Sequence, residues 1–576
     1  MEKWRMKALS LIGSSNVRRR DRTASAKRTG VRRIGVLGAV AALLFAACGG
    51  STPSASAAPA GSTAPAGSSA PAGSAATVSS PSAAASTAAC TQGGTLTVAS
   101  PWDASDLVPW NSAGTMEYAQ MQIYDQLVEQ LPGYTTLQPG LAQTWDISPD
   151  GLTYTFHLRD AQFSNGDPVT AEDVKFSLNR MIDPKVDVNW AFLYGSVNNF
   201  AVVDDKTVQM NMKSVDAGIL GSLSIPGGSI YSEKAFNTLG EDGFGKAPVG
   251  SGPFMVKSWT IGQGIDLVRN PHYWRQGQPY LDEVDIVDIT DENARVLKVL
   301  SGEADVALSI PDSLVSQVQG SSSAKIETFK KMVGWQVFLN NTVKPFDDPL
   351  VRQAMNYAAP KQQLNQSILG GLGTISNSMM AQNGLFWDPT VAPYPYDLAK
   401  AKQLLAQSSV PNGFSFTLNL EKGLLPSQEG AEILQAAWAQ LGIKMTITTL
   451  DSAVFNDDQG KLNYQALMFN PPDISSDSPD DSEYAGIFYA YNDTWKSFFT
   501  GYKSPQVSQL VQEADSSVDN AKRQQLYSQL QQMVMQDAPF VTLLNAPEID
   551  VVSNKVSGFN SVLTSWGLLG TVCLNN

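Results

Sequence analysis

The sequence has few of the residues from which metal centres and catalytic sites are built. Among 576 residues there are two histidines and three cysteines, and no Cys/His cluster has the spacing of metal ligands. The chain also lacks an HExxH motif, a G-x-S-x-G nucleophile elbow and a Walker loop. Gly262-Gln263-Gly264 lacks the third glycine and the strand–helix context of a dinucleotide site. We therefore expect no metal, no cofactor and no catalytic residue, and a protein that is not an enzyme.

The apolar run near the N-terminus is too short to span a membrane comfortably. Ile34–Ala47 has 14 residues without a charge, whereas a spanning helix needs about 20. Residues 1–33 before it carry eleven Lys/Arg and two acids, and the run ends in Leu44-Phe45-Ala46-Ala47-Cys48. This pattern resembles a lipoprotein signal peptide comprising residues 1–47, with Cys48 as the lipidated residue. An ordinary signal peptide and a single membrane anchor are the alternatives.

Charged residues are absent from residues 49–91, which consist mainly of Ala, Ser, Pro, Thr and Gly. The sequence APAGS recurs there three times, starting at Ala58, Ala64 and Ala70. Such a composition cannot bury enough apolar surface to form a core. We interpret residues 48–92 as a disordered tether rich in Ala, Ser, Pro and Gly.

Basic residues are scarce in the rest of the chain. Residues 1–47 hold eleven of the 40 basic and two of the 54 acidic residues, which leaves 29 basic residues, 52 acidic ones and a net charge of −23. This charge argues against binding to nucleic acid. It fits either solubility outside the cell or a cationic ligand. The length exceeds that of a single hydrophobic core, so we expect two or more domains.

Residues Leu141–Met181 contain a strand, a turn and a capped helix. Tyr154, Phe156 and Leu158 alternate with polar residues, which predicts a strand with one buried face. After a turn at Asn165–Pro168, Thr170 stands at a helix N-cap, with two acids in the first turn. This segment is scaffold and carries no chemistry.

A second scaffold segment, Ala247–Trp274, predicts a hairpin. Gly250-Ser251-Gly252-Pro253 is a tight turn before a strand at Phe254–Trp259. Gly262 and Gly264 make the next turn, and Ile265–Val268 is the second strand.

In this order, the two segments resemble the framework of the family 5 solute-binding proteins of ABC importers, which include dipeptide, oligopeptide and nickel binders. The resemblance implies an α/β fold, the two-lobed periplasmic-binding-protein type II (Venus flytrap) with an extra subdomain in lobe I. The implied parts are lobe I at residues 93–328 with its subdomain at about 124–239, lobe II at 333–545, and a C-terminal segment, 546–576, that completes lobe I. His157 and His272 lie in the two framework segments, which argues further against a metal.

Lobe II begins with a segment, FDDPLVRQAMNYAAPKQQL, that also resembles the family. Asp348 can cap a helix with Pro349 in its first position. Further helices are predicted at Asp397–Gln407 and Ser427–Leu441, after Ser504-Pro505, and from Asp519, with a strand at Lys444–Thr449.

The resemblance places the ligand in the cleft between the lobes. Aromatic residues at expected cleft loops suggest a ligand with a flat or apolar surface, although core packing explains each of them equally well. These candidates are Trp110, Trp190, Tyr194, Trp335, Trp387 and Phe469. Asn470 and Asp473 follow. In peptide-binding members the Asp that Asp473 resembles takes the ligand's α-ammonium, and the alternative is an acidic surface loop.

The resemblance also implies a disulfide between Cys90 and Cys573, because both ends of the mature chain lie in one lobe of the family fold. Two unpaired thiols are the alternative. The implied function is that of a monomeric lipoprotein on the outer face of the cell membrane. It would deliver a small solute to an ABC permease and its ATPase, with a peptide as the first candidate and an oligosaccharide as the second. A sensor without transport and a secreted enzyme on the same scaffold are the alternatives.

Overall fold

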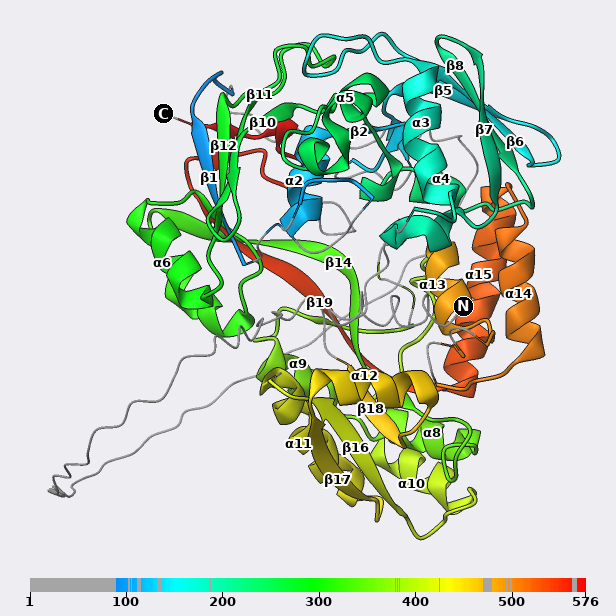
Figure 1. Ribbon diagram of the computed structural model, residues 1–576. Helices are drawn as coiled ribbons and strands as arrows, with labels where there is room; N and C mark the ends of the chain where they lie inside the picture. The colour runs from blue at the N-terminus through cyan, green and yellow to red at the C-terminus, as the bar shows by residue number, and fades with distance from the viewer. Residues whose placement is uncertain are drawn as a thin grey trace, which may run out of the picture. The chain divides into compact units, whose positions relative to one another are not determined.

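The computed structural model describes residues 90–575, except for residues 102–103, 105, 111–114, 132–136, 187, 379, 381, 383, 424, 470–478, 494–495, 498–499 and 562–566. A mixed sheet of eleven strands runs through both lobes (Figure 1). In spatial order the strands are β10 (Phe254–Thr260), β11 (Gly264–Arg269), β12 (Glu283–Asp288), β1 (Thr95–Ser100), β13 (Val306–Ala307), β19 (Phe540–Ser553), β14 (Ala324–Leu339), β18 (Ala466–Phe469), β16 (Ser415–Glu421) and β17 (Lys444–Leu450), and β15 (Thr374–Ile375) pairs with β19.

The long strands β14 and β19 connect the lobes. They pair antiparallel, from Ala324 opposite Ser553 to Phe338 opposite Phe540, and Figure 1 shows them side by side. Two hydrophobic clusters contain lobe I residues and two contain lobe II residues. Along β14 the chain leaves a lobe I cluster at Ala324 and enters a lobe II cluster at Trp335. Each lobe therefore has its own core, and the two strands are the described segments that cross between them.

The predicted subdomain elements of lobe I are present. A four-stranded sheet has the order β5 (Ala142–Ile147), β6 (Thr153–Leu158), β8 (Thr207–Met212) and β7 (Val197–Asp204). Tyr154, Phe156 and Leu158 are buried, as their alternation predicts. The predicted helix is α3 (Ala171–Ile182), and its capping box joins Thr170 and Asp173. The hairpin prediction is also confirmed, because β10 pairs antiparallel with β11.

Lobe II is built from parallel strands and helices. β16 pairs in parallel with both β17 and β18. The helices are α8 (Pro349–Tyr357), α9 (Lys361–Ile368), α10 (Leu398–Ala406), α11 (Leu425–Ala439), α12 (Ser452–Lys461), α13 (Asp481–Phe488), α14 (Pro505–Asp515) and α15 (Asn520–Asp537). The predicted cap Asp348 accepts a backbone amide of the helix that follows it. Asp397, Ser504 and Asp519, where helices are predicted to start, do the same. These short-range signals were therefore sufficient to locate the helix starts.

The two ends of the described chain are joined covalently. Cys90 and Cys573 form a disulfide with Cα atoms 5.6 Å apart, which is the pairing that the resemblance implied. Nearby, Thr91 Oγ1 donates to Leu574 O at 3.1 Å, and the short strands β20 (Val556–Ser557) and β21 (Cys573–Leu574) pair. None of the helices in the described ranges is long and apolar enough to cross a membrane. Cys48 and the predicted tether lie outside the described residues apart from residues 90–92.

Candidate ligand-binding site

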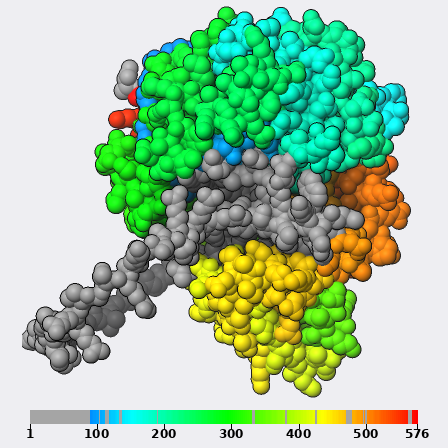
Figure 2. All heavy atoms as spheres, viewed as in Figure 1, coloured from blue at the N-terminus to red at the C-terminus, as the bar shows by residue number. Residues whose placement is uncertain are grey.

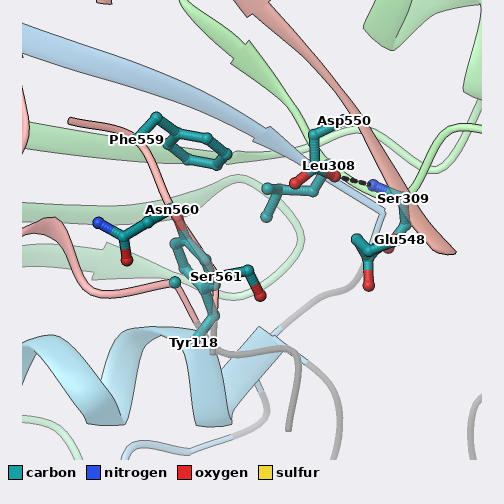
Figure 3. Close-up of a pocket in the computed structure, with 9 residues that line it drawn as sticks. Tyr118, Leu308, Ser309, Glu548, Asp550, Phe559, Asn560 and Ser561 are labelled. Atoms are coloured by element: carbon teal, nitrogen blue, oxygen red, sulfur yellow. Dashed lines mark hydrogen bonds between the residues drawn. The ribbon is translucent and has the colours of Figure 1, made fainter. Parts of the chain in front are cut away.

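A small pocket opens beside the lobe I half of β19 (Figure 3). Three other segments complete its walls: α2 (Thr115–Ile123), the loop after β13 and the chain after β20. The lining residues are Tyr118, Leu308, Ser309, Glu548, Asp550, Phe559, Asn560, Ser561 and Gly567. The fold thus gathers residues that are far apart in the sequence at the strand that crosses between the lobes.

Two carboxylates give the pocket its charge. Glu548 and Asp550 are two positions apart on β19, so their side chains leave the same face of the strand. They are 7% and 2% exposed. Ser309 connects them, since its N–H donates to Asp550 Oδ1 at 2.8 Å and its hydroxyl donates to Glu548 Oε1 at 2.6 Å (Figure 3). A pair of buried carboxylates favours a cationic group, which can bind by charge-assisted hydrogen bonds.

Ser309 adopts a backbone conformation that L-residues seldom use. Its φ is +52°, in the left-handed region. The neighbouring Ile310 N–H donates to Ile549 O at 2.8 Å, which fixes this loop against β19. The left-handed residue therefore turns both of its hydrogen-bonding groups towards the two acids.

The opposite wall offers a neutral phenol and an apolar ring. Tyr118 is 4% exposed, and burial and then the charge of Asp550 raise the pKa of its hydroxyl, so it stays a neutral donor. Tyr118 Oη and Asn560 Oδ1 have no hydrogen-bond partner among the described residues. Phe559 packs edge-on against Phe329, with ring centroids 5.8 Å apart. Both unpaired polar atoms belong to lining residues, so a bound solute can supply their partners.

Four of the predicted ligand contacts lie within the hydrophobic cores. Trp110 is 1% exposed, lies in the lobe I core, and has the guanidinium of Arg180 4.1 Å above its ring. Trp190 and Tyr194 are buried in the same core. Trp335 is buried in the lobe II core. None of the four lines the pocket, and each side chain lies among core residues, so the structure gives no support to their assignment as ligand contacts, which remains a prediction.

The other predicted contacts are placed only in part. Trp387 is half-buried, and its indole Nε1 donates to Asn377 Oδ1 at 2.8 Å. Phe469 ends β18 opposite Gln336. The side chain of Phe469, together with Asn470 and Asp473, lies outside the described residues, so these assignments remain predictions.

The sequence analysis missed Ser309, Glu548 and Asp550. A signal was present, because Glu548 and Asp550 alternate within an otherwise mostly apolar strand, which predicts two acids on one face. No comparable signal marks Ser309. In the described part of the chain, no group of three or more His, Cys, Asp or Glu residues could hold a metal ion.

Two α/β lobes, two crossing strands and a pocket beside one of them define the class of two-lobed solute-binding proteins. The model of the family described as "Bacterial extracellular solute-binding proteins, family 5 Middle" matches residues 136–496. The chain belongs to this family. It is therefore an extracytoplasmic substrate-binding protein of an ABC importer, and not an enzyme.

Individual relatives agree over most of the chain. The glutathione-binding protein GsiB of Salmonella typhi is 28% identical over 484 residues, which cover 83% of this chain and 93% of that protein. The solved structure of HbpA2 from Haemophilus parasuis has a TM-score of 0.77 at 24% identity and covers 84% of this chain and 100% of that one. DppA from Helicobacter pylori, solved with the peptide STSA, has a TM-score of 0.69 at 27% identity, with 84% and 99% covered.

Proposed function

We propose that this protein captures a solute with a free ammonium group, a peptide in the first place, and delivers it to a membrane permease driven by an ATPase. The observation that carries this proposal is the buried pair Glu548 and Asp550 in the pocket. An ammonium group can donate charge-assisted hydrogen bonds to both carboxylates. Two relatives support the ligand class, because one is a glutathione-binding protein and the other was solved with a peptide.

The size of the pocket suits one end of a solute. Ligand pockets usually enclose about 300–1,000 Å³, whereas this pocket has a volume of about 20 Å³, which is room for little more than one water-sized group. We assign the ammonium end to Glu548 and Asp550. The Tyr118 hydroxyl, which has no partner among the described residues, would donate to an oxygen of the same solute.

The position of the pocket connects binding to closure. Glu548 and Asp550 lie on β19, which pairs with β14 where the two strands pass between the lobes. A solute that bonds to these residues and also to lobe II favours the closed arrangement, because only that arrangement completes its contacts. Asp473 and Trp387 remain the lobe II residues that we propose for this role.

We also propose that the receptor is a monomer held at the outer face of the membrane by a lipid on Cys48. The basic segment, the short apolar run and the small residues before Cys48 support this anchor. The uncharged residues 48–92 would let the two lobes reach the permease.

Isothermal titration with Ser-Thr-Ser-Ala and with its N-acetylated form tests the ammonium site. We expect acetylation to weaken binding about 10- to 100-fold, because it removes a charge-assisted hydrogen bond that contributes about 1.5–3 kcal/mol. E548Q and D550N should each weaken binding of the free peptide to a similar extent. E421Q is the matched control, because Glu421 is a buried carboxylate in lobe II, 8% exposed, that does not line the pocket.

Equal affinity for the free and acetylated peptides would overturn the ammonium site. If neither peptide binds, the same titration with free and acetylated forms of other peptides decides whether a free ammonium is required. Wild-type affinity of both E548Q and D550N for a confirmed ligand would move the site elsewhere in the protein.

A further inference from the structure

The two lobes touch at a second place, away from the crossing strands. Ala217, just before α4 (Ile219–Ser222) in the lobe I subdomain, donates its N–H to the carbonyl oxygen of Asp515 at the end of α14 in lobe II, at 2.9 Å. Figure 1 shows α4 beside the helices α13–α15, and the space-filling view in Figure 2 shows the orange helices of lobe II meeting the cyan subdomain. This contact is made by segments that must separate when the lobes open.

The contact is closely packed. A Cβ atom added to Gly218 would lie 2.0 Å from the hydroxyl of Ser482, which is in lobe II. A Cβ atom on Gly151 would meet Val215 of lobe I at 3.2 Å and Val518 of lobe II at 3.5 Å. The two lobes are therefore in van der Waals contact at these residues, and Asp216 and Asp515 beside the contact are partly buried.

Three carboxylates and one guanidinium meet at this contact. Asp216 comes from lobe I and accepts hydrogen bonds from the Ser196 hydroxyl and the Gly218 N–H. From lobe II come Asp480 and Asp515. Arg523 also comes from lobe II, and it donates to both oxygens of Asp480, at 2.9 and 2.6 Å. One cation thus faces three acids, and its donors are directed to one of them.

Neutral groups and one further acid complete the surroundings. The Tyr527 hydroxyl on α15 donates to Asp515 at 2.9 Å, and the Tyr154 hydroxyl on β6 donates to the backbone oxygen of Asp216 at 3.4 Å. Burial raises the pKa of both phenols, so neither loses its proton near pH 7. Asp481 lies behind Asp480, where burial raises its pKa to about 7, and it accepts the Phe386 N–H.

Burial also raises the pKa of the two acids that meet across the contact. Burial raises the pKa of Asp216. The negative charge of Asp480 raises this pKa further, and the positive charge of Arg523 lowers it. Burial is the main reason why the pKa of Asp515 is raised to about 7. The hydrogen bond from Tyr527 and the positive charge of Arg523 lower this pKa, and the negative charges of Asp216 and Asp480 raise it. In an open state, water would reach both acids and their pKa values would move towards the ordinary value of about 4.

We propose that closure of the two lobes takes up a proton at the Asp216–Asp515 contact, so that acidity favours the closed receptor. One proton moves from solvent to a carboxylate oxygen, and no other bond changes. That this pH dependence regulates solute capture rests on the function proposed above. The pH dependence of closure itself does not depend on which solute is bound.

The sign of the effect follows from linkage. A group whose pKa is higher in the closed state than in the open state binds more protons when the lobes are closed. Closure is therefore favoured as the pH falls from about 7 towards about 4, and the ratio of closed to open molecules changes by at most about tenfold per pH unit for one proton. From pH 7 to pH 5 the ratio should rise by up to about 100-fold.

Electron–electron distance measurements on the ligand-free protein test the proposal. Spin labels are placed at V203C in lobe I and V454C in lobe II, which are exposed residues of β7 and α12. We expect the short-distance population to grow between pH 7 and pH 5 in the otherwise wild-type chain. In D216N/D515N, which replaces both carboxyl groups by amides that do not titrate, the population should be independent of pH.

Two further variants separate this effect from a general one. E421Q removes a buried lobe II carboxylate away from the contact, and it should keep the wild-type pH dependence. G218A should lower the short-distance population at every pH, because its methyl group collides with Ser482. If D216N/D515N does not fold, the single variants D216N and D515N should each show a smaller pH response.

A wild-type distance distribution that does not change between pH 7 and pH 5 would overturn the proposal. An unchanged pH response in D216N/D515N would do the same. Because no solute is present, neither result bears on the ammonium site, which the peptide titrations test separately.

Discussion

Trp110 lies in an aromatic group within the lobe I core. Its ring centroid is 5.4 Å from that of Tyr231, 5.7 Å from Phe236 and 6.4 Å from Phe244. The Arg180 guanidinium covers the ring at 4.1 Å, a cation–π contact of about 0.5–2 kcal/mol. The indole therefore contributes to stability through packing on several sides.

The variant W110A should be strongly destabilised and should bind solute normally when folded. Removing a buried Trp costs about 3–5 kcal/mol, measured as a shift of the urea unfolding midpoint. W110F, which keeps an aromatic ring, should lose less. Weaker solute binding by W110A with unchanged unfolding would support Trp110 as a ligand contact.

At the scale of the element, α3 shows how a short sequence fixes a helix start. Thr170 Oγ1 accepts the Asp173 N–H at 3.4 Å, and Asp173 Oδ2 accepts the Thr170 N–H at 3.0 Å. Asp173 Oδ1 also accepts the N–H of Glu233, at 3.0 Å, which is the first residue of α5 (Glu233–Phe244). The same carboxylate thus holds two helix starts together.

T170A should destabilise the protein by about 1 kcal/mol, because the N-cap bond is lost. D173A should cost more than T170A, since it removes the hydrogen bond to α5 as well. T170S keeps the cap oxygen and should stay close to wild type. Chemical unfolding of the three variants gives this order, and equal losses in T170A and D173A would exclude the second role of Asp173.

Elements could be predicted from the sequence wherever their signals are local. The Thr170 cap, the alternation in β6 and the Ser504-Pro505 start of α14 involve a few neighbouring residues each. The pocket could not be predicted in this way, because Ser309 and Glu548 are 239 positions apart and meet through the pairing of β13 with β19. Aromatic residues were also ambiguous, since a Trp in a loop and a Trp in a core have the same local sequence.

At the scale of the whole molecule, the disulfide closes most of the described chain into a covalent ring. Cys90 and Cys573 are 483 positions apart. Between β20 and β21, the C-terminal segment also supplies Phe559, Asn560 and Gly567 to the pocket. The covalent link therefore stabilises one wall of the candidate ligand site.

The double variant C90S/C573S should be less stable by about 2–5 kcal/mol. Its backbone amides from Val556 to Ser561 should exchange with deuterium faster than in the wild type, while those of β16 in lobe II should not. A reducing agent should reproduce the change in the wild type and have no effect on the double variant. Identical exchange in both proteins would show that the packing of the segment suffices without the bond.

The same disulfide decides how the receptor responds to being pulled. Cys90 stands five residues before β1, at the point where a tether anchored through Cys48, as proposed above, would transmit force into the folded body. Tension arriving there passes to Cys573 and is divided between the first and last strands. If the lipid anchor proposed at Cys48 holds the receptor at the membrane, this link would let the folded body resist unfolding from its N-terminal end under tension.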